Sequence, residues 1–159
     1  MLFRSRRVTT PDGLTFLLSD TVGFIRRLPP QLVAAFKATL EELDEADLLL
    51  HLIDASHPQM MEQKDTVDKI LGELGLLAKP VVEVFNKMDL LPAGVEHAFF
   101  WGNTSVARVA ISALTGFGLD RLLKVVQQIL MAARGPANGR TPAAYVTTQG
   151  KGRSPGARG

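Results

Sequence analysis

The stretch VVEVFNKMD, residues 81–89, joins an apolar run to a short polar turn. The run VVEVF has the length and β-branched content of a strand buried in a parallel sheet. Asn86-Lys87-Met88-Asp89 follows at its carboxyl end, where ligands of open α/β sheets bind. The stretch therefore predicts a parallel strand with a candidate binding turn, although Asn and Asp are also common in ordinary strand exits.

Strands and helices alternate on both sides of this stretch. Residues 4–10 and 14–19 predict a hairpin, because the sequence Thr10-Pro11-Asp12-Gly13 between them suits a tight turn. The other predicted elements are a helix at 30–43, a strand at 47–53, a helix at 58–74, a strand at 108–111 and a helix at 118–133. This order predicts an α/β fold with a mostly parallel sheet and flanking helices.

Composition narrows the class of protein. A chain of 159 residues suits one domain, and the absence of cysteine excludes disulfides and thiolate metal sites. No long apolar segment follows the basic N-terminus, and the longest apolar run is too short to cross a bilayer. We therefore expect a cytoplasmic location, with neither membrane nor DNA as a partner.

Charge is unevenly distributed along the chain. Residues 134–159 carry five basic side chains and no acidic one, whereas residues 1–133 carry 13 basic and 16 acidic side chains. This contrast predicts a folded unit at 1–133 and a basic, disordered tail at 134–159. A tail of this charge is also suited to contact with RNA phosphates, and that alternative stays open.

The turn after residue 85 has the chemistry to recognise guanine. The carboxylate of Asp89 can accept hydrogen bonds from N1–H and the exocyclic amine of guanine, a pair that adenine does not offer. Asn86 offers both a donor and an acceptor, and the methylene stem of Lys87 can lie over the base. Ser112-Ala113-Leu114 follows the next predicted strand and can bring backbone N–H groups to the guanine carbonyl, or else simply cap a helix.

Asp20-Thr21-Val22-Gly23 stands at the end of the predicted hairpin. A carboxylate there can reach Mg²⁺, and the N–H of Gly23 can meet a terminal phosphate; a plain turn is the alternative. Phe24 follows the glycine and has no polar atom to orient a water molecule, so no catalytic residue is assigned. No stretch has the phosphate-binding form G-x-x-x-x-G-K-[ST].

Longer strings of sequence closely resemble the HflX-type GTPases, which are ribosome-associated translational GTPases. The matching strings are Asp20-Thr21-Val22-Gly23-Phe24-Ile25-Arg26-Arg27-Leu28-Pro29, residues 32–36, residues 39–42, residues 46–51 and Asp54-Ala55-Ser56. The resemblance implies GTP or GDP and Mg²⁺ as cofactors, Asp20 as the metal-binding residue, and the large ribosomal subunit as partner. It implies a nucleotide site made of Asp20, Thr21, Val22, Gly23, Phe24, Asn86, Lys87, Met88, Asp89, Ser112, Ala113 and Leu114.

The resemblance also implies that residues 1–133 form a partial Ras-like G domain that lacks the first strand and the P-loop. In the Ras-like strand order 2-3-1-4-5-6 that first strand is central. Its absence predicts that its two neighbours pair directly, that the fold is loose, or that another chain fills the gap.

The expected function is GTP binding and hydrolysis linked to ribosome association, with this chain carrying only the guanine-reading and switch II parts. Without the P-loop we expect the isolated chain to bind GTP weakly and to hydrolyse it negligibly. The alternative is an inactive remnant that binds RNA or the ribosome without nucleotide.

Two further residues have open roles. His51 lies within an apolar strand and is expected to be a core or sheet-edge residue rather than a catalyst. Asp54, at the end of that strand, either supports the site or caps a helix.

Overall fold

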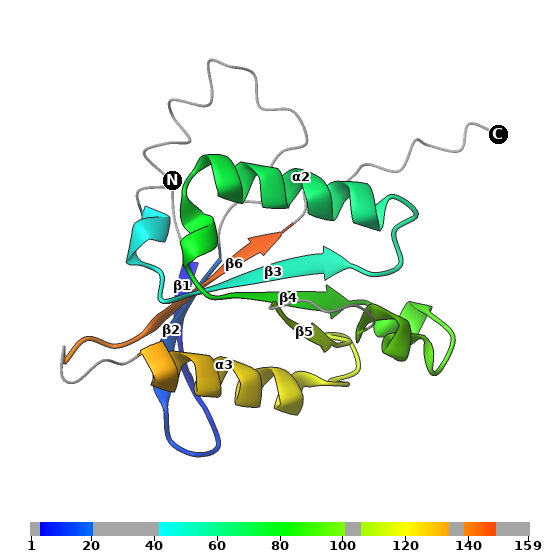
Figure 1. Cartoon of the computed structure of the whole chain (residues 1–159). Coiled ribbons are helices and arrows are strands. Elements are labelled where there is room, and N and C mark those ends of the chain that lie inside the picture. The colour runs from blue at the N-terminus through cyan, green and yellow to red at the C-terminus, as the bar shows by residue number, and fades with distance from the viewer. Residues whose placement is uncertain (1–3, 21–41, 101–105, 134–138, 149–159) are drawn as a thin grey trace.

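The computed structural model describes residues 4–20, 42–100, 106–133 and 139–148. Its centre is a six-stranded sheet in the order β1-β2-β6-β3-β4-β5 (Figure 1). The strands are β1 Arg4–Thr9, β2 Thr15–Asp20, β3 Leu48–Asp54, β4 Val81–Asn86, β5 Ala107–Ala110 and β6 Ala143–Thr148. Only β1 runs antiparallel to its neighbour, so the predicted α/β fold with a mostly parallel sheet is confirmed.

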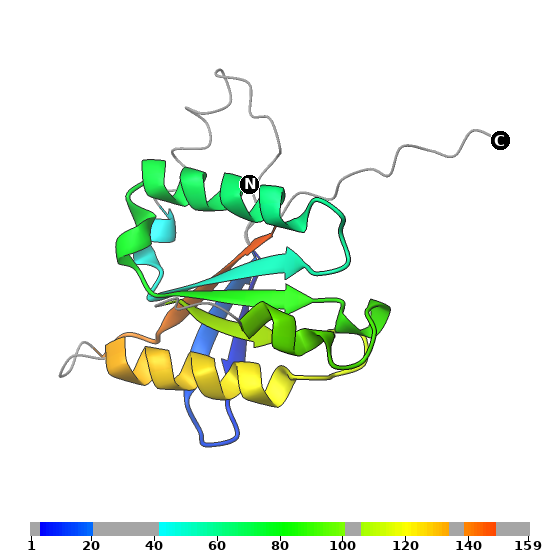
Figure 2. The ribbon, with the colours of Figure 1, turned by 45° about the vertical axis from the view of Figure 1, so that its right-hand side comes forward.

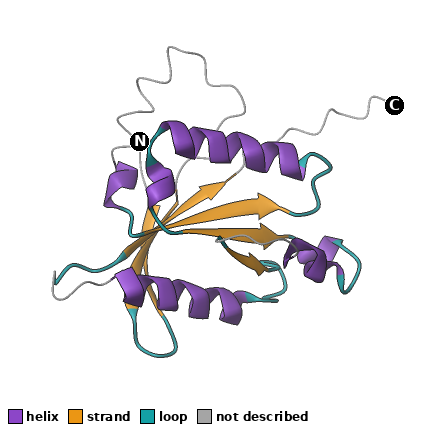
Figure 3. Ribbon diagram, viewed as in Figure 1, coloured by secondary structure: helices purple, strands orange, loops and turns teal. Residues whose placement is uncertain are grey.

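Among the described residues, one long helix lies on each face of the sheet, α2 at Met60–Glu73 and α3 at Leu119–Ala133 (Figure 2). The short 3₁₀ turns are η1 Glu42–Glu45, η2 Leu76–Ala78, η3 Met88–Leu90 and η4 Val95–Phe100. Figure 3 shows this layering of strands between helices. The chain therefore buries both faces of the central strands, as their nearly continuous apolar sequences predict.

Side-chain alternation divides the core between the two faces. On the α3 face, Leu50 and Val84 of the central strands pack with Val126 and Leu130 of the helix. On the α2 face, Leu49 packs with Val67 and Leu71. Because successive residues of a strand point to opposite faces, β3 and β4 contribute to both layers.

The central place between β2 and β3 is filled by β6, the last strand of the chain. It runs parallel to both neighbours, with Ala144 opposite Leu18 on one side and opposite Leu48 on the other. Ala143 and Ala144 are buried, and Val146 packs against the α3-face core. None of the three expected outcomes for this gap occurs, because the chain itself supplies the missing neighbour.

The start of β6 is anchored by Asp47, directly before β3. One Asp47 carboxylate oxygen accepts from the Arg140 guanidinium at 2.6 Å, and the other accepts from the Ala143 N–H at 2.9 Å. The N–H of Asp47 donates in turn to the Ala143 carbonyl at 2.9 Å. These bonds fix the register in which β6 enters the sheet.

Two sequence predictions need correction or stand outside the described residues. The predicted disorder of the tail 134–159 is wrong for residues 143–148, because these residues form strand β6 and are ordered by backbone pairing with β2 and β3. The predicted helix at 30–43 lies almost wholly outside the described residues, and its last two positions begin the 3₁₀ turn η1.

Candidate nucleotide-binding site

The carboxyl ends of three adjacent parallel strands meet at one edge of the sheet. β3 ends at Asp54, which is the register partner of Asn86 at the end of β4. β5 ends at Ala110, two residues before Ser112. The structure thus brings together the two motifs predicted to read guanine, and it adds Asp54 beside them.

Hydrogen bonds join the turn after β4 to the turn after β5. The Asn86 side-chain carbonyl accepts from the N–H of Ala113 at 3.0 Å. The backbone N–H of Met88 donates to the Ile111 carbonyl at 3.1 Å, and Met88 itself is buried. Each turn therefore holds the other in place. The N–H of Ala113, expected to face guanine, is engaged by Asn86 in this arrangement.

Asp89 is oriented by Ser112. The fully buried Ser112 hydroxyl donates to Asp89 Oδ1 at 2.6 Å and accepts from the N–H of Thr115 at 3.2 Å. Asp89 remains exposed to solvent. A carboxylate has about four acceptor positions, so one bond from Ser112 leaves capacity for two donors of a base.

The side chain of Lys87 extends from the turn after β4 to the end of β3. Its backbone has a φ of 69°, and it is the only non-glycine residue with positive φ among the described residues. Its ammonium donates to Asp54 Oδ2 at 2.6 Å. Asp54 Oδ1 accepts from both the N–H and the hydroxyl of Ser56, at 3.0 and 2.6 Å.

These contacts lower the pKa of Asp54, and they show that its carboxylate is used on Lys87 and Ser56. Partial burial raises the pKa of its carboxyl group, but the hydrogen bonds from Lys87 and Ser56 outweigh burial and lower that pKa below its ordinary value. Asp54 does not cap α2, since that helix has Gln59 as N-cap with no side-chain cap. Sequence reasoning left Ser56 unassigned, although the pattern Asp-x-Ser is a common side-chain turn.

Gly118 shapes the turn that carries Ser112. It has a φ of +75°, and a Cβ added there would lie 2.1 Å from the Ala110 carbonyl oxygen. The Phe117 carbonyl directly before it accepts from the N–H of Ser112 at 2.9 Å. A glycine is therefore required for this turn to return close to the end of β5.

Asp20 is the last residue of β2, which runs parallel to β6, and it is exposed. β6 and β3 separate β2 from β4, and the strand registers place Asp20 level with Val82, four residues before Asn86, so Asp20 is displaced from the end of β4 both across and along the sheet. Thr21, Val22, Gly23 and Phe24 lie outside the described residues.

The described residues contain no group of three or more His, Cys, Asp or Glu side chains suited to a metal. A single exposed carboxylate fits the Mg²⁺ of nucleotide sites, which keeps several waters and takes most other ligands from phosphate.

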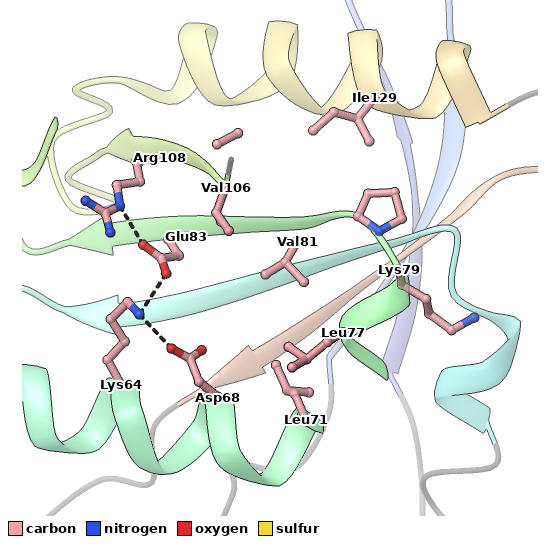
Figure 4. A pocket seen from close by; sticks show the side chains of 12 residues that line it. Lys64, Asp68, Leu71, Leu77, Lys79, Val81, Glu83, Val106, Arg108 and Ile129 are labelled. Atoms are coloured by element: carbon pink, nitrogen blue, oxygen red, sulfur yellow. Dashed lines mark hydrogen bonds and ion pairs between the residues drawn. The ribbon is translucent and has the colours of Figure 1, made fainter. Parts of the chain in front are cut away.

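A second polar cluster lies away from this edge, between α2 and strands β4 and β5 (Figure 4). Lys64 pairs with Asp68 at 2.6 Å and with the buried Glu83 at 2.9 Å, and Glu83 also accepts from Arg108 at 2.7 Å. They border a cavity of about 690 Å³. The hydrogen bonds to Asp68 and Glu83 outweigh partial burial and raise the pKa of Lys64. Because each charge in this cluster has a partner, it serves to join α2 to the sheet.

His51 is fully buried beside this cluster, as the sequence predicts for a core residue. Its ring has no hydrogen-bond partner within the described part of the chain, and Nδ1 lies 3.7 Å from Asp68. Burial lowers the pKa of His51 to about 4, despite the nearby carboxylates of Asp68 and Glu83. His51 is therefore neutral near pH 7 and lies within β3, not at the strand ends where the candidate site forms.

Comparison with known proteins identifies the family of the chain. A sequence profile of the family described as 50S ribosome-binding GTPase matches residues 3–87, more than half of the chain. The chain belongs to this family, and its homologues include the HflX GTPases. GTPase HflX of Akkermansia muciniphila is 49% identical over 129 residues, and that of Lacrimispora saccharolytica is 46% identical over 126. GTPase HflX of Escherichia coli is 40% identical over 125 residues.

Each of these HflX alignments covers 79% of the chain, but only 29–30% of the relative. The chain thus spans less than a third of the length of these HflX proteins. A solved complex of the protein SsGBP with GDP is 28% identical, with a TM-score of 0.66, over 82% of this chain and 43% of that one. No helix among the described residues is long and apolar enough to cross a membrane.

Proposed function

We propose that the edge formed by Asn86–Asp89 and Ser112–Leu114 binds the guanine base of GTP or GDP. The observation that carries this proposal is the preformed pair of turns, in which Ser112 orients Asp89 and Asn86 holds Ala113. A base with two adjacent donors satisfies the exposed carboxylate of Asp89, whereas adenine leaves it unpaired. The GDP complex of the similar protein SsGBP supports a guanine nucleotide as the ligand class.

The phosphate end of the nucleotide would lie toward Asp20. Asp20 would hold Mg²⁺ through water, and the phosphates would supply further ligands. The sequence has no P-loop lysine or P-loop Ser/Thr, so the base supplies most of the affinity in this chain. We therefore propose weak GTP binding and negligible hydrolysis by the chain alone, in the cytoplasm.

Ribosome association is the second part of the proposed function. The family that matches residues 3–87 is described as binding the 50S ribosomal subunit. Co-sedimentation of the chain with 50S subunits, with and without GTP, tests this part. If the amount of chain that co-sediments is the same with and without GTP, the result favours the alternative, a ribosome-binding module that works without GTP.

Nucleotide binding is tested by comparing guanosine with adenosine in amide NMR titrations of the full chain. We expect guanosine, but not adenosine, to shift the amides of Met88, Ala113 and Thr115. Asp89→Asn should abolish this selectivity, since an amide presents a donor where guanine also presents donors. Asp65→Asn on the exposed side of α2 is the matched control and should leave it intact. Equal shifts with both nucleosides would contradict a guanine site.

A further inference from the structure

The Asp54–Lys87 ion pair joins the end of β3 to the turn that follows β4. We propose that Asp54 is a positioning residue for guanine-nucleoside binding, which holds the Lys87 side chain so that its methylene stem covers one face of the base. This inference rests on the proposed function and extends it to Asp54, which is not among the residues assigned to the nucleotide site.

The carboxylate of Asp54 is held from both sides. Oδ2 accepts from the Lys87 ammonium at 2.6 Å, while Oδ1 accepts from the N–H and the hydroxyl of Ser56. Its side chain is 27% exposed, and that of Lys87 is 50% exposed. The partner of Lys87 is thus itself fixed, which distinguishes this pair from mobile surface ion pairs.

The backbone on both sides of Lys87 is fixed as well. The Asn86 carbonyl accepts from the N–H of Ala55 at 3.0 Å, and the N–H of Met88 donates to Ile111. Lys87 lies between these anchors with a φ of 69°, a conformation that costs free energy in a residue with a Cβ. Its Cα–Cβ direction is therefore set, and the contact with Asp54 restricts the remaining side-chain torsions.

This restriction favours the bound state before any ligand arrives. A free lysine loses several rotamers when its stem packs on a base, whereas a lysine already held by Asp54 loses few. The stem meets the face of the ring and not its edge. Asp54 should consequently affect the affinity for guanosine and inosine equally, and leave discrimination against adenosine to Asp89.

A double-mutant cycle on the full chain, read by calorimetric titration with guanosine, tests this role. We expect Asp54→Asn to weaken guanosine binding about fivefold when Lys87 is present. In a Lys87→Met background the same substitution should change binding by less than about twofold. Asp65→Asn is the control and should have no effect in either background. Equal losses in both backgrounds, or no loss in either, would overturn the proposal.

Acetylation of nucleotide-free protein gives a readout that does not depend on binding. Asp54→Asn should raise the acetylation rate of Lys87 about threefold or more by releasing its amine, while exposed Lys69 keeps its rate. An unchanged rate at Lys87 would show that Asp54 does not hold it in solution. If no variant binds guanosine while the Lys87 rate rises, the proposed function fails but the Asp54–Lys87 contact stands.

Discussion

At the residue scale, the candidate site depends on a few side chains that orient one another. Ser112 has no solvent exposure, yet its hydroxyl reaches the exposed carboxylate of Asp89 at 2.6 Å. The side-chain carbonyl of Asn86 accepts a hydrogen bond from the N–H of Ala113. Each of these bonds joins the turn after one strand to the turn after the next, so each is a separate target for substitution.

Ser112→Ala should weaken guanosine binding about tenfold, because Asp89 loses the hydrogen bond that orients it. Isothermal titration with guanosine measures this loss. Thr66→Ala is the control, since it removes a hydroxyl that bonds only to the backbone of its own helix. An affinity that stays within twofold of the original would contradict the orienting role of Ser112.

Gly118→Ala should destabilise the fold by about 2 kcal/mol or more, because a Cβ would collide with the Ala110 carbonyl oxygen in addition to straining φ. Gly116→Ala is a close control, since Gly116 has a φ of +88° but nothing within 4 Å of an added Cβ. It should cost only about 1 kcal/mol. Urea unfolding of both variants measures the difference, and equal costs would show that the collision is relieved.

At the element scale, β6 and α2 are each fixed to the sheet by polar contacts. Asp47 fixes the start of β6, and the paired charges of Lys64, Glu83 and Arg108 join α2 to β4 and β5. His51 and Thr147 are register partners on β3 and β6, and both are buried with no side-chain hydrogen bond to any residue that the structure describes. The contact between β6 and β3 therefore buries two polar side chains that add no hydrogen bond to the pairing of these strands.

Asp47→Ala should loosen β6, because it removes the acceptor of both Arg140 and the Ala143 N–H. We expect hydrogen exchange of the β6 amides to accelerate about tenfold, which corresponds to the loss of about 1.4 kcal/mol. Exchange in β4 should change less, and Asp44→Ala serves as a nearby control. Unchanged exchange in β6 would show that pairing with β2 and β3 alone holds the strand.

Protonation of His51 should destabilise the fold between pH 6.5 and about 4. Its pKa is about 4 in the folded chain, against 6.5 for an unperturbed histidine, so the unfolded chain binds the proton more readily within this window. Stability should fall as pH drops, by up to about 1.4 kcal/mol per pH unit. Urea midpoints at pH 6.5 and 5.0 measure this slope. His51→Leu should flatten it, whereas His97→Leu should not.

At the scale of the whole molecule, the sheet is continuous only because the C-terminal part of the chain returns to its centre. β2 and β3 pair with β6 and not with each other. The hairpin β1–β2 would otherwise have no partner among the described strands. The continuity of the sheet thus depends on the six residues of β6, Ala143–Thr148.

Deletion of residues 139–159 should abolish cooperative thermal unfolding, because it removes β6 and leaves the facing edges of β2 and β3 without backbone partners. Deletion of residues 149–159 alone keeps β6 and should preserve cooperativity. Circular dichroism melting of the two truncated chains compares them. A cooperative transition after the longer deletion would show that β2 and β3 can pair directly.

Much of the fold and of the candidate site was predictable from sequence, for a local reason. Strands 48–54 and 81–86 are recognisable as apolar runs in the sequence. The binding motifs Asn86–Asp89 and Ser112–Leu114 are recognisable because each consists of consecutive residues. The Ser112–Asp89 bond was not predictable in the same way. It joins residues 23 positions apart, and only the parallel arrangement of β4 and β5 brings them together.

The sequence by itself determined the fold class, the family and the residues at the strand ends, because these follow from side-chain periodicity and from motifs read along the chain. The tertiary structure decided the place of residues 143–148 and the pairing of Asp54 with Lys87. The segment Ala143–Thr148 has a composition compatible with strand or coil. It becomes the central strand because the backbone groups of β2 and β3 face a gap that only distant sequence can fill.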